Sequence, residues 1–275
     1  KTILSTRAGE LARRGAEGHS CASGKTACEP HGKKPSMCPA TTSRVCQSLC
    51  FSRAMPIADI KSYLAPLSEE LRREWPKNRM VHVVFHGHSV PAGYFRTPVV
   101  DTFHAYPHLV HVGIKAAYPH AVVNATVTAI GGENSLSGAK RFERDVLSLR
   151  PDVVVIDYAL NDRGVGLDAA RAAWISMIVA CRQKNIKVIL CTPTGDTAAR
   201  RNDPNDALVQ HTEQIKRLAS EHEVGLADVF SAWSAAIIKV GEPVLHSQGN
   251  HPSFDGHKVA ESVITPWFTA PVKGR

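Results

Sequence analysis

Four residues of the chain carry groups that acyl transfer requires. Ser89 lies in a Gly-His-Ser turn immediately after the β-rich segment 80–85. Gly132 and Asn161 also follow apolar segments, and His251 lies in an Asn-His-Pro loop near the end of the chain. A serine hydroxyl, a histidine that takes its proton and N–H donors for a developing oxyanion are the minimum set for acyl transfer.

Five short apolar segments predict the strands that would position these residues: 80–85, 121–130, 152–156, 186–191 and 224–226. The third and fourth are continuously apolar, as in strands buried on both faces. Helical periodicity alternates with them, at 102–118, 137–149, 166–184, 206–222 and about 255–268. This alternation implies right-handed βαβ units. We therefore predict an α/β fold with three α/β/α layers around a central five-stranded parallel sheet.

Open parallel sheets bind ligands beyond the carboxyl ends of their strands. Ser89, Gly132 and Asn161 each follow an expected strand, so we expect them to share one edge of the sheet. A glycine there lets backbone N–H groups approach an oxyanion closely. The serine turn differs from the Gly-x-Ser-x-Gly elbow of α/β-hydrolases because residue 91 is proline.

Taken together, these segments resemble the sequence blocks of the SGNH (GDSL-type) hydrolases, in the family's order. Ser89, Gly132, Asn161 and His251 stand at the positions of the family's Ser, Gly, Asn and His. The stretch 142–162 (FERDVLSLRPDVVVIDYALND) also resembles the family's helix, Arg-Pro-Asp, apolar strand and Asn-Asp. The resemblance covers about residues 80–270 and implies a flavodoxin-like SGNH-hydrolase fold.

The resemblance implies a serine esterase that needs no cofactor and no metal. Ser89 would form an acyl-enzyme intermediate, with His251 as general base. The oxyanion hole would consist of the Ser89 and Gly132 N–H groups and the Asn161 side chain. We expect a short-chain ester, acetyl or a similar small acyl group, on a small molecule or a carbohydrate. This preference follows the family's habit and the lack of a long apolar lid segment.

Three positions depart from the family pattern. His88 replaces the family's Asp before the serine, and Ala159 replaces a Gly. Gln248 stands three residues before His251, where the family has its catalytic acid. A glutamine carbonyl could fix the imidazole tautomer, but it cannot stabilise the imidazolium by charge.

Four groups therefore remain candidates to support His251: Gln248, a backbone carbonyl, Asp255 and Asp228. The two aspartates are better explained as caps of the helices that follow them. We favour a Ser–His dyad without a carboxylate.

Two alternatives to this hypothesis stay open. His86 and His88 could ligate zinc together with Asp157 or Asp162, although buried structural histidines are the better explanation. The chain could also be a catalytically impaired SGNH-like module that binds a ligand or glycan. The oligomeric state cannot be predicted.

Charge is distributed unevenly along the 275 residues. Residues 1–54 hold nine Lys and Arg against three Glu, a net of +6, whereas the remainder carries 24 basic and 22 acidic side chains, a net of +2. A nearly balanced domain has no basic surface for nucleic acid. No apolar run reaches the roughly 18 residues that a membrane helix needs, so we expect neither partner.

The first 54 residues also hold five of the seven cysteines and little periodic apolar pattern. We predict a poorly structured extension at 1–54 and the SGNH-like domain at 55–275, with Met55 as a hypothetical native start. The chain shows no signal peptide pattern, and we expect a soluble cytoplasmic protein.

Overall fold

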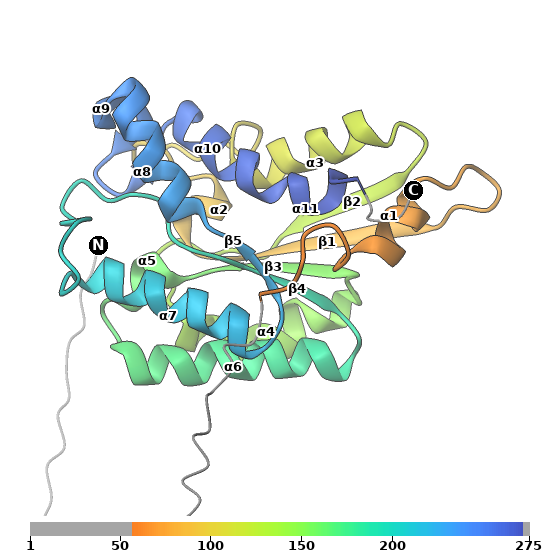
Figure 1. Cartoon of the computed structure of the whole chain (residues 1–275), viewed down its shortest axis with the longest axis horizontal. Coiled ribbons are helices and arrows are strands. Elements are labelled where there is room, and N and C mark those ends of the chain that lie inside the picture. The colour runs from red at the N-terminus through yellow and green to blue at the C-terminus, as the bar shows by residue number, and fades with distance from the viewer. Residues whose placement is uncertain (1–56, 272–275) are drawn as a thin grey trace, which may run out of the picture. The chain divides into compact units, whose positions relative to one another are not determined.

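A five-stranded parallel sheet forms the centre of the computed structural model, which describes residues 57–271. Its strands are β1 (Met80–Gly87), β2 (Val122–Val127), β3 (Val153–Asp157), β4 (Lys187–Cys191) and β5 (Gly225–Ala227). They lie in the order β2-β1-β3-β4-β5, and every neighbouring pair is parallel. The predicted five-stranded parallel sheet is confirmed (Figure 1).

Helices cover both faces of the sheet, which confirms the predicted three layers (Figure 1). One layer contains α1 (Ala65–Leu71), α3 (Tyr106–Ala117), α8 (Val229–Val240), α10 (Phe254–Ile264) and α11 (Pro266–Thr269). The other contains α4 (Ser135–Asp145), the 3-10 turn η1 (Leu147–Leu149), α6 (Leu167–Gln183) and α7 (Ala207–Glu221). Short elements complete the fold: α2 (Ser89–Ala92), α5 (Ala159–Asp162), α9 (Glu242–Leu245), β6 (His246–Gln248) and β7 (His251–Pro252).

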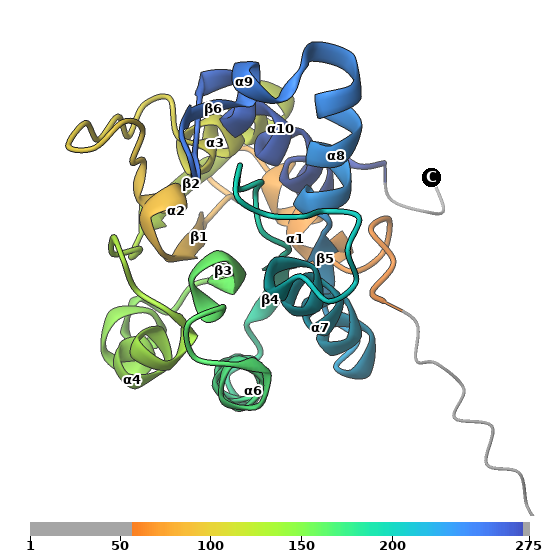
Figure 2. The same ribbon diagram turned by 90° about the vertical axis from the view of Figure 1, so that its left-hand side faces the viewer.

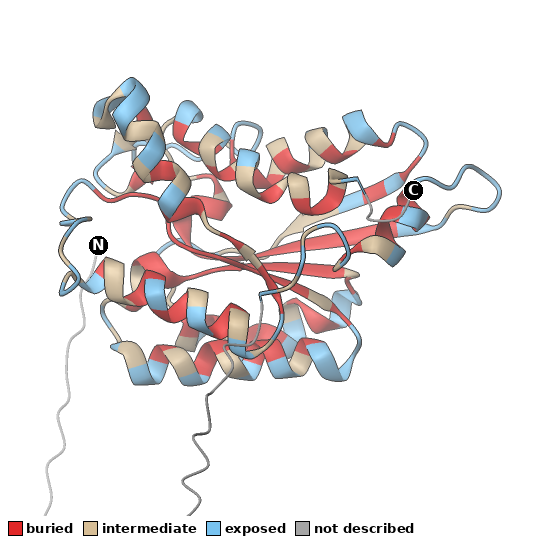
Figure 3. Ribbon diagram, in the orientation of Figure 1, coloured by how far each residue is buried: buried red, intermediate tan, exposed pale blue. Residues whose placement is uncertain are grey.

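The three central strands, β1, β3 and β4, are buried between two separate apolar cores (Figure 3). In β1, Val83 and Phe85 pack on the α3 and α10 side, whereas Val84 packs on the α4 and α6 side. Successive side chains of a strand point to opposite faces, so a sheet covered by two layers needs apolar residues at both. This is why the strand segments read as continuous apolar runs.

Several boundaries differ from those expected from the sequence. The helix expected over 102–118 begins only at Tyr106, after turns at 102–104. The final helix is divided into α10 and α11 at Pro266, whose missing N–H cannot continue the helix. Helix α8 confirms the helix expected after Asp228, although its segment is not among the periodic ones given above. The N-terminal extension predicted at 1–54 lies outside the described residues.

None of the helices between residues 57 and 271 has both the length and the apolar character that crossing a bilayer requires.

Gly138 allows α4 to pack closely against the side chain of Tyr158, the residue after β3. A Cβ at this position would lie 2.2 Å from the Tyr158 hydroxyl oxygen. We expect Gly138→Ala to lower the free energy of unfolding by about 1–3 kcal/mol, because overpacking outweighs the better helix propensity of alanine. Urea denaturation measures this change. Gly164→Ala is the control, since its Cβ would meet nothing closer than the Asn161 carbonyl oxygen at 3.7 Å. Equal stabilities of the two variants would contradict the packing described.

Candidate active site

Three of the four expected site residues follow neighbouring strands at one edge of the sheet. Gly132, Ser89 and Asn161 come after β2, β1 and β3, which are adjacent in the sheet. The strand order reverses at β1, and ligand crevices form at such points in open α/β sheets. The Ile130 N–H donates to the Gly87 carbonyl (3.0 Å) and so ties the chain after β2 to the end of β1. Figure 2 faces this edge.

Ser89 is placed at the sheet edge by an abrupt change from strand to helix. It is the first residue of α2, which is separated from β1 only by His88, and it is 6% exposed. The turn requires Gly87, because a Cβ there would lie 2.4 Å from the Asp157 carbonyl oxygen. The first N–H groups of a helix have no acceptor within it. The Ser89 N–H is therefore a suitable donor to an oxyanion.

His251 meets the serine hydroxyl from the β6–β7 hairpin. Its Nε2 lies 3.1 Å from the Ser89 Oγ, and its Nδ1 lies 2.7 Å from the Phe95 carbonyl oxygen. A carbonyl can only accept, so this contact assigns the ring proton to Nδ1. Nε2 then presents its lone pair to the serine, as a general base requires.

Gln248 forms no hydrogen bond with the imidazole, although it occupies the position of the family's acid. Its side-chain oxygen accepts the Thr97 backbone N–H at 2.8 Å. Thr97 lies two residues after Phe95, so Gln248 stabilises the loop that carries the carbonyl bound to His251. Of the groups considered from the sequence, a backbone carbonyl is the one that contacts Nδ1.

The two candidate aspartates have other partners. Asp228 caps α8 by accepting the Ser231 N–H at 3.2 Å, as expected. Asp255 lies in the first turn of α10 and pairs with Lys258 at 2.5 Å. The expected cap role of Asp255 is wrong, because Ser253 caps that helix. Asp255 is the second residue of the helix, whereas a cap is the residue that precedes the first helical residue.

Burial lowers the pKa of His251 below the ordinary value of 6.5. The Phe95 carbonyl opposes this shift by favouring the protonated ring, whereas the nearby His88 lowers the pKa further. Desolvation dominates because a charged imidazolium loses hydration in a buried site. His251 is therefore neutral, and able to accept a proton, at neutral pH.

Contacts other than those of His251 hold the expected oxyanion donors in place. Gly132 has a φ of +80°, a backbone conformation that favours glycine. The Asn161 side-chain amide donates one hydrogen to the Glu133 carbonyl at 2.8 Å, which orients the amide and leaves its second hydrogen for a ligand. Arg141 fixes the Glu133 carboxylate at 2.5 Å. Sequence reasoning did not identify this Glu133–Arg141 pair, and only their eight-residue spacing across a helix start could have suggested it.

His86 is a structural histidine in the core. Its Nδ1 lies 2.9 Å from the Thr128 hydroxyl and its Nε2 lies 3.0 Å from the Tyr158 hydroxyl. Burial lowers the pKa of His86 to about 3, so the ring stays neutral.

The other residues considered as zinc ligands belong to two separate sets of contacts. Asp162 accepts the Ser135 N–H and the Trp174 indole N–H, each at 2.7 Å. His88 instead faces Asp157, with 3.4 Å between Nε2 and Oδ1. Within residues 57–271, no three His, Cys, Asp or Glu side chains are grouped as metal ligands would be.

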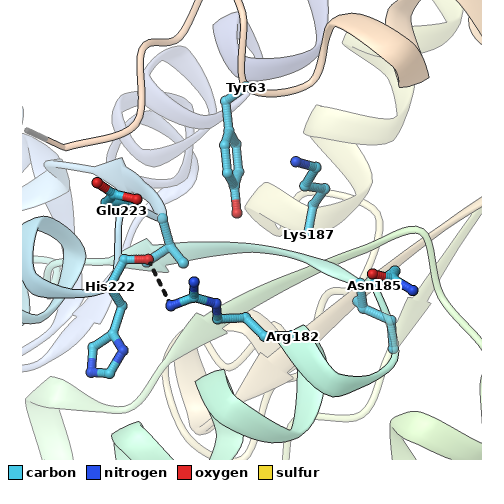
Figure 4. A pocket seen from close by; sticks show the side chains of 8 residues that line it. Tyr63, Arg182, Asn185, Lys187, His222 and Glu223 are labelled. Carbon is cyan, nitrogen blue, oxygen red and sulfur yellow. Dashed lines mark hydrogen bonds between the residues drawn. The ribbon is translucent and has the colours of Figure 1, made fainter.

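Figure 4 shows a surface hollow of about 440 Å³ at the other end of the sheet from these residues. Tyr63, Arg182, Lys187 and Glu223 are among the residues that line it, at the amino-terminal ends of β4 and β5. Ligands of open parallel sheets bind at the opposite, carboxyl edge. The contact between Ser89 and His251, rather than the size of a hollow, therefore identifies the candidate site.

Comparison with known families gives a match over most of the described residues. The model of the GDSL-like lipase/acylhydrolase family matches residues 85–259, a range that includes Ser89, Gly132, Asn161 and His251.

Individual relatives agree with this match. The chain is 23% identical over 158 residues to an acetylxylan esterase of Geobacillus stearothermophilus, covering 53% of this chain and 72% of that protein. A crystal structure of that organism's acetylxylan esterase superposes with a TM-score of 0.62 at 22% identity, covering 71% of this chain and 97% of the other. A mutant described as an acetyl-xylooligosaccharide esterase gives the same values. Catalytic mutants of that enzyme replace a serine, a histidine or an aspartate by alanine.

Replacing either candidate aspartate tests whether a carboxylate supports His251. In Asp255→Asn and in Asp228→Asn, we expect a fluorophosphonate to label Ser89 at a rate within about threefold of that in the wild type. Neither aspartate side chain contacts the imidazole. Thermal unfolding of each variant controls for lost stability, especially at the α8 cap. A loss of about 10³-fold from one substitution would identify that aspartate as the missing acid.

Proposed function

The chain belongs to the GDSL-like lipase/acylhydrolase family, and on that premise we propose that it is a serine esterase that removes small acyl groups, acetyl in particular, from carbohydrate or small-molecule esters. The observation that carries the proposal is the contact of Ser89 Oγ with His251 Nε2 at 3.1 Å, with the far side of the ring held by the Phe95 carbonyl at 2.7 Å. Membership of the family supports ester hydrolysis in general, and the steps below are our proposal.

In the first half of the reaction, the Ser89 oxygen attacks the ester carbonyl carbon while His251 Nε2 takes the hydroxyl proton. The carbonyl π electrons move to oxygen, which becomes the oxyanion of a tetrahedral intermediate. The Ser89 and Gly132 N–H groups and the Asn161 amide donate to this oxyanion. His251 then gives its proton to the leaving alcohol, and the acyl group remains on Ser89.

In the second half, water replaces the alcohol. His251 takes a proton from the water as its oxygen attacks the acyl carbon, and the same donors hold the second oxyanion. Collapse of the intermediate returns the proton to Ser89 Oγ and releases the carboxylic acid.

The Phe95 carbonyl supplies part of what a carboxylate would supply. It fixes the Nδ1–H tautomer and the orientation of the ring, as the carboxylate of a triad does. It carries only a partial negative charge, so it stabilises the imidazolium less than a carboxylate does. A hydrogen bond to a charged partner is roughly twice as strong as one between neutral groups.

Two observations support a small acyl group on a carbohydrate. Relatives of the chain are acetylxylan esterases. The Tyr94 ring also lies beside the base, with its centroid 5.9 Å from that of His251. A Cβ added at Gly131 would lie 3.0 Å from the same ring, so Tyr94 forms an aromatic wall between the base and the segment of the oxyanion hole. An ester bound between the base and the oxyanion donors would meet this ring, which supports a small acyl group.

Covalent labelling tests the proposed function. A fluorophosphonate should add once to the full chain and not to Ser89→Ala, as measured by intact mass, and kcat/KM on p-nitrophenyl esters should fall from acetate to octanoate. Acetylated xylo-oligosaccharides are the carbohydrate test substrate. Absence of both an adduct and acetate hydrolysis would instead support the binding module.

The lowered pKa of His251 predicts the pH profile of the reaction. The base must be neutral to accept the serine proton, so kcat/KM should be flat near neutral pH and fall as His251 becomes protonated. Because burial lowers the pKa of His251, the midpoint of this acid limb should lie below 6.5. The profile of kcat/KM for p-nitrophenyl acetate between pH values of about 4 and 8 measures it. A midpoint above 6.5 would contradict the neutral, desolvated base.

A further inference from the structure

Two buried polar atoms face each other directly behind the nucleophile without a hydrogen bond of good geometry. They are Nε2 of His88 and Oδ1 of Asp157, which lie 3.4 Å apart. The His88 side chain is 1% exposed and that of Asp157 is 4% exposed. Leaving such groups unsatisfied is costly, and contacts in an unliganded site commonly tighten when substrate binds.

Each of the two residues has a second, well-defined contact. The Asp157 Oδ2 accepts the Tyr106 hydroxyl at 3.1 Å. Burial raises the pKa of Tyr106, so the phenol remains a donor. On the other side, His88 Nδ1 accepts the Val90 N–H at 3.2 Å and thereby caps α2.

These contacts determine the protonation of the His88 ring. Nδ1 can accept the Val90 N–H only if it carries no proton, so in a neutral ring the proton is on Nε2 and points toward Asp157. An aspartate, which the family has at this position, would cap the helix without help. An imidazole caps it only in one tautomer, and a buried acceptor opposite Nε2 selects that tautomer.

We propose that Asp157 and His88 are positioning residues for the nucleophile: Asp157, oriented by Tyr106, holds the His88 tautomer that caps α2 and so fixes Ser89 relative to His251. This inference rests on the proposed function, since it assigns a role toward the catalytic serine. This Asp–His couple contacts the backbone of the nucleophile turn instead of the reacting atoms.

Histidine NMR tests the tautomer independently of catalysis. In the full chain labelled with ¹⁵N-histidine, His88 should show a protonated Nε2 and an unprotonated Nδ1, with its signals assigned by their loss in His88→Asn. In Asp157→Asn the Nδ1-protonated form should increase. A protonated Nδ1 in the wild type, or a tautomer unaffected by Asp157→Asn, would overturn the proposal.

Kinetics test the positioning role. For p-nitrophenyl acetate, Asp157→Asn should lower kcat by about 10-fold to 100-fold, the scale expected for a misplaced reacting group, with KM changed by less than about threefold. Titration of active sites with a fluorophosphonate expresses kcat per folded, competent site, so a loss of folded protein alone would leave kcat unchanged.

Rescue distinguishes positioning from a general effect on the core. Asparagine caps helices well without a partner, so the double variant His88→Asn with Asp157→Asn should regain most of the kcat lost in Asp157→Asn. His88→Asn alone should be less active than the double variant, because it removes the donor opposite Asp157 Oδ1 and leaves the buried carboxylate with only the Tyr106 hydrogen bond. A double variant no better than Asp157→Asn would contradict the inference.

Asp152→Asn provides a matched control at the other end of β3. Asp152 pairs with Arg79 at 2.8 Å, so its substitution should reduce stability and leave kcat per site unchanged. An inactive, unlabelled wild type would overturn the proposed function. An active wild type with Asp157→Asn kcat within twofold of it would overturn only the positioning role.

Discussion

The hydrogen bond from His251 Nδ1 to the Phe95 carbonyl joins the two segments that make up the site. It connects the loop after α2 to the β6–β7 hairpin, and it leaves the Nε2 lone pair facing Ser89. The loop itself is held where Thr97 donates to Gln248, the residue at the position of the family's acid. The substitution of that acid thus coincides with a change in what supports the histidine: a backbone dipole replaces a side-chain charge. Such a support keeps the geometry of a triad and gives up part of its electrostatics.

The sheet carries the rest of the arrangement. Three adjacent strands end beside one another, so residues 72 positions apart, such as Ser89 and Asn161, belong to the same edge. Close packing between β1 and β3 at Gly87 fixes where the serine turn begins. The same contact places His88 and Asp157 side by side. The close approach of backbone segments thus sets the positions of the site residues, and side-chain hydrogen bonds then select their protonation states.

Much of this could be predicted from the sequence, because apolar runs and turn residues record burial and strand ends directly. The strand segments, the parallel sheet and the relation of Ser89 to β1 follow from such patterns. The Phe95 carbonyl could not be predicted, since every residue has a carbonyl and its use depends on tertiary contact. The partners of Gln248 and His88 could not be predicted for the same reason, because each partner is far away in the sequence. The late start of α3 depends on turns whose residues also suit a helix.

The central claim is that a serine and a histidine act here with a backbone carbonyl in place of an acid. A crystal structure of the enzyme after reaction with a fluorophosphonate tests it most directly. The account predicts phosphorus on Ser89 Oγ, a phosphonyl oxygen within about 3 Å of the Ser89 and Gly132 nitrogens and the Asn161 amide, and the Phe95 carbonyl on His251 Nδ1. A carboxylate on Nδ1, or an adduct on another residue, would contradict it.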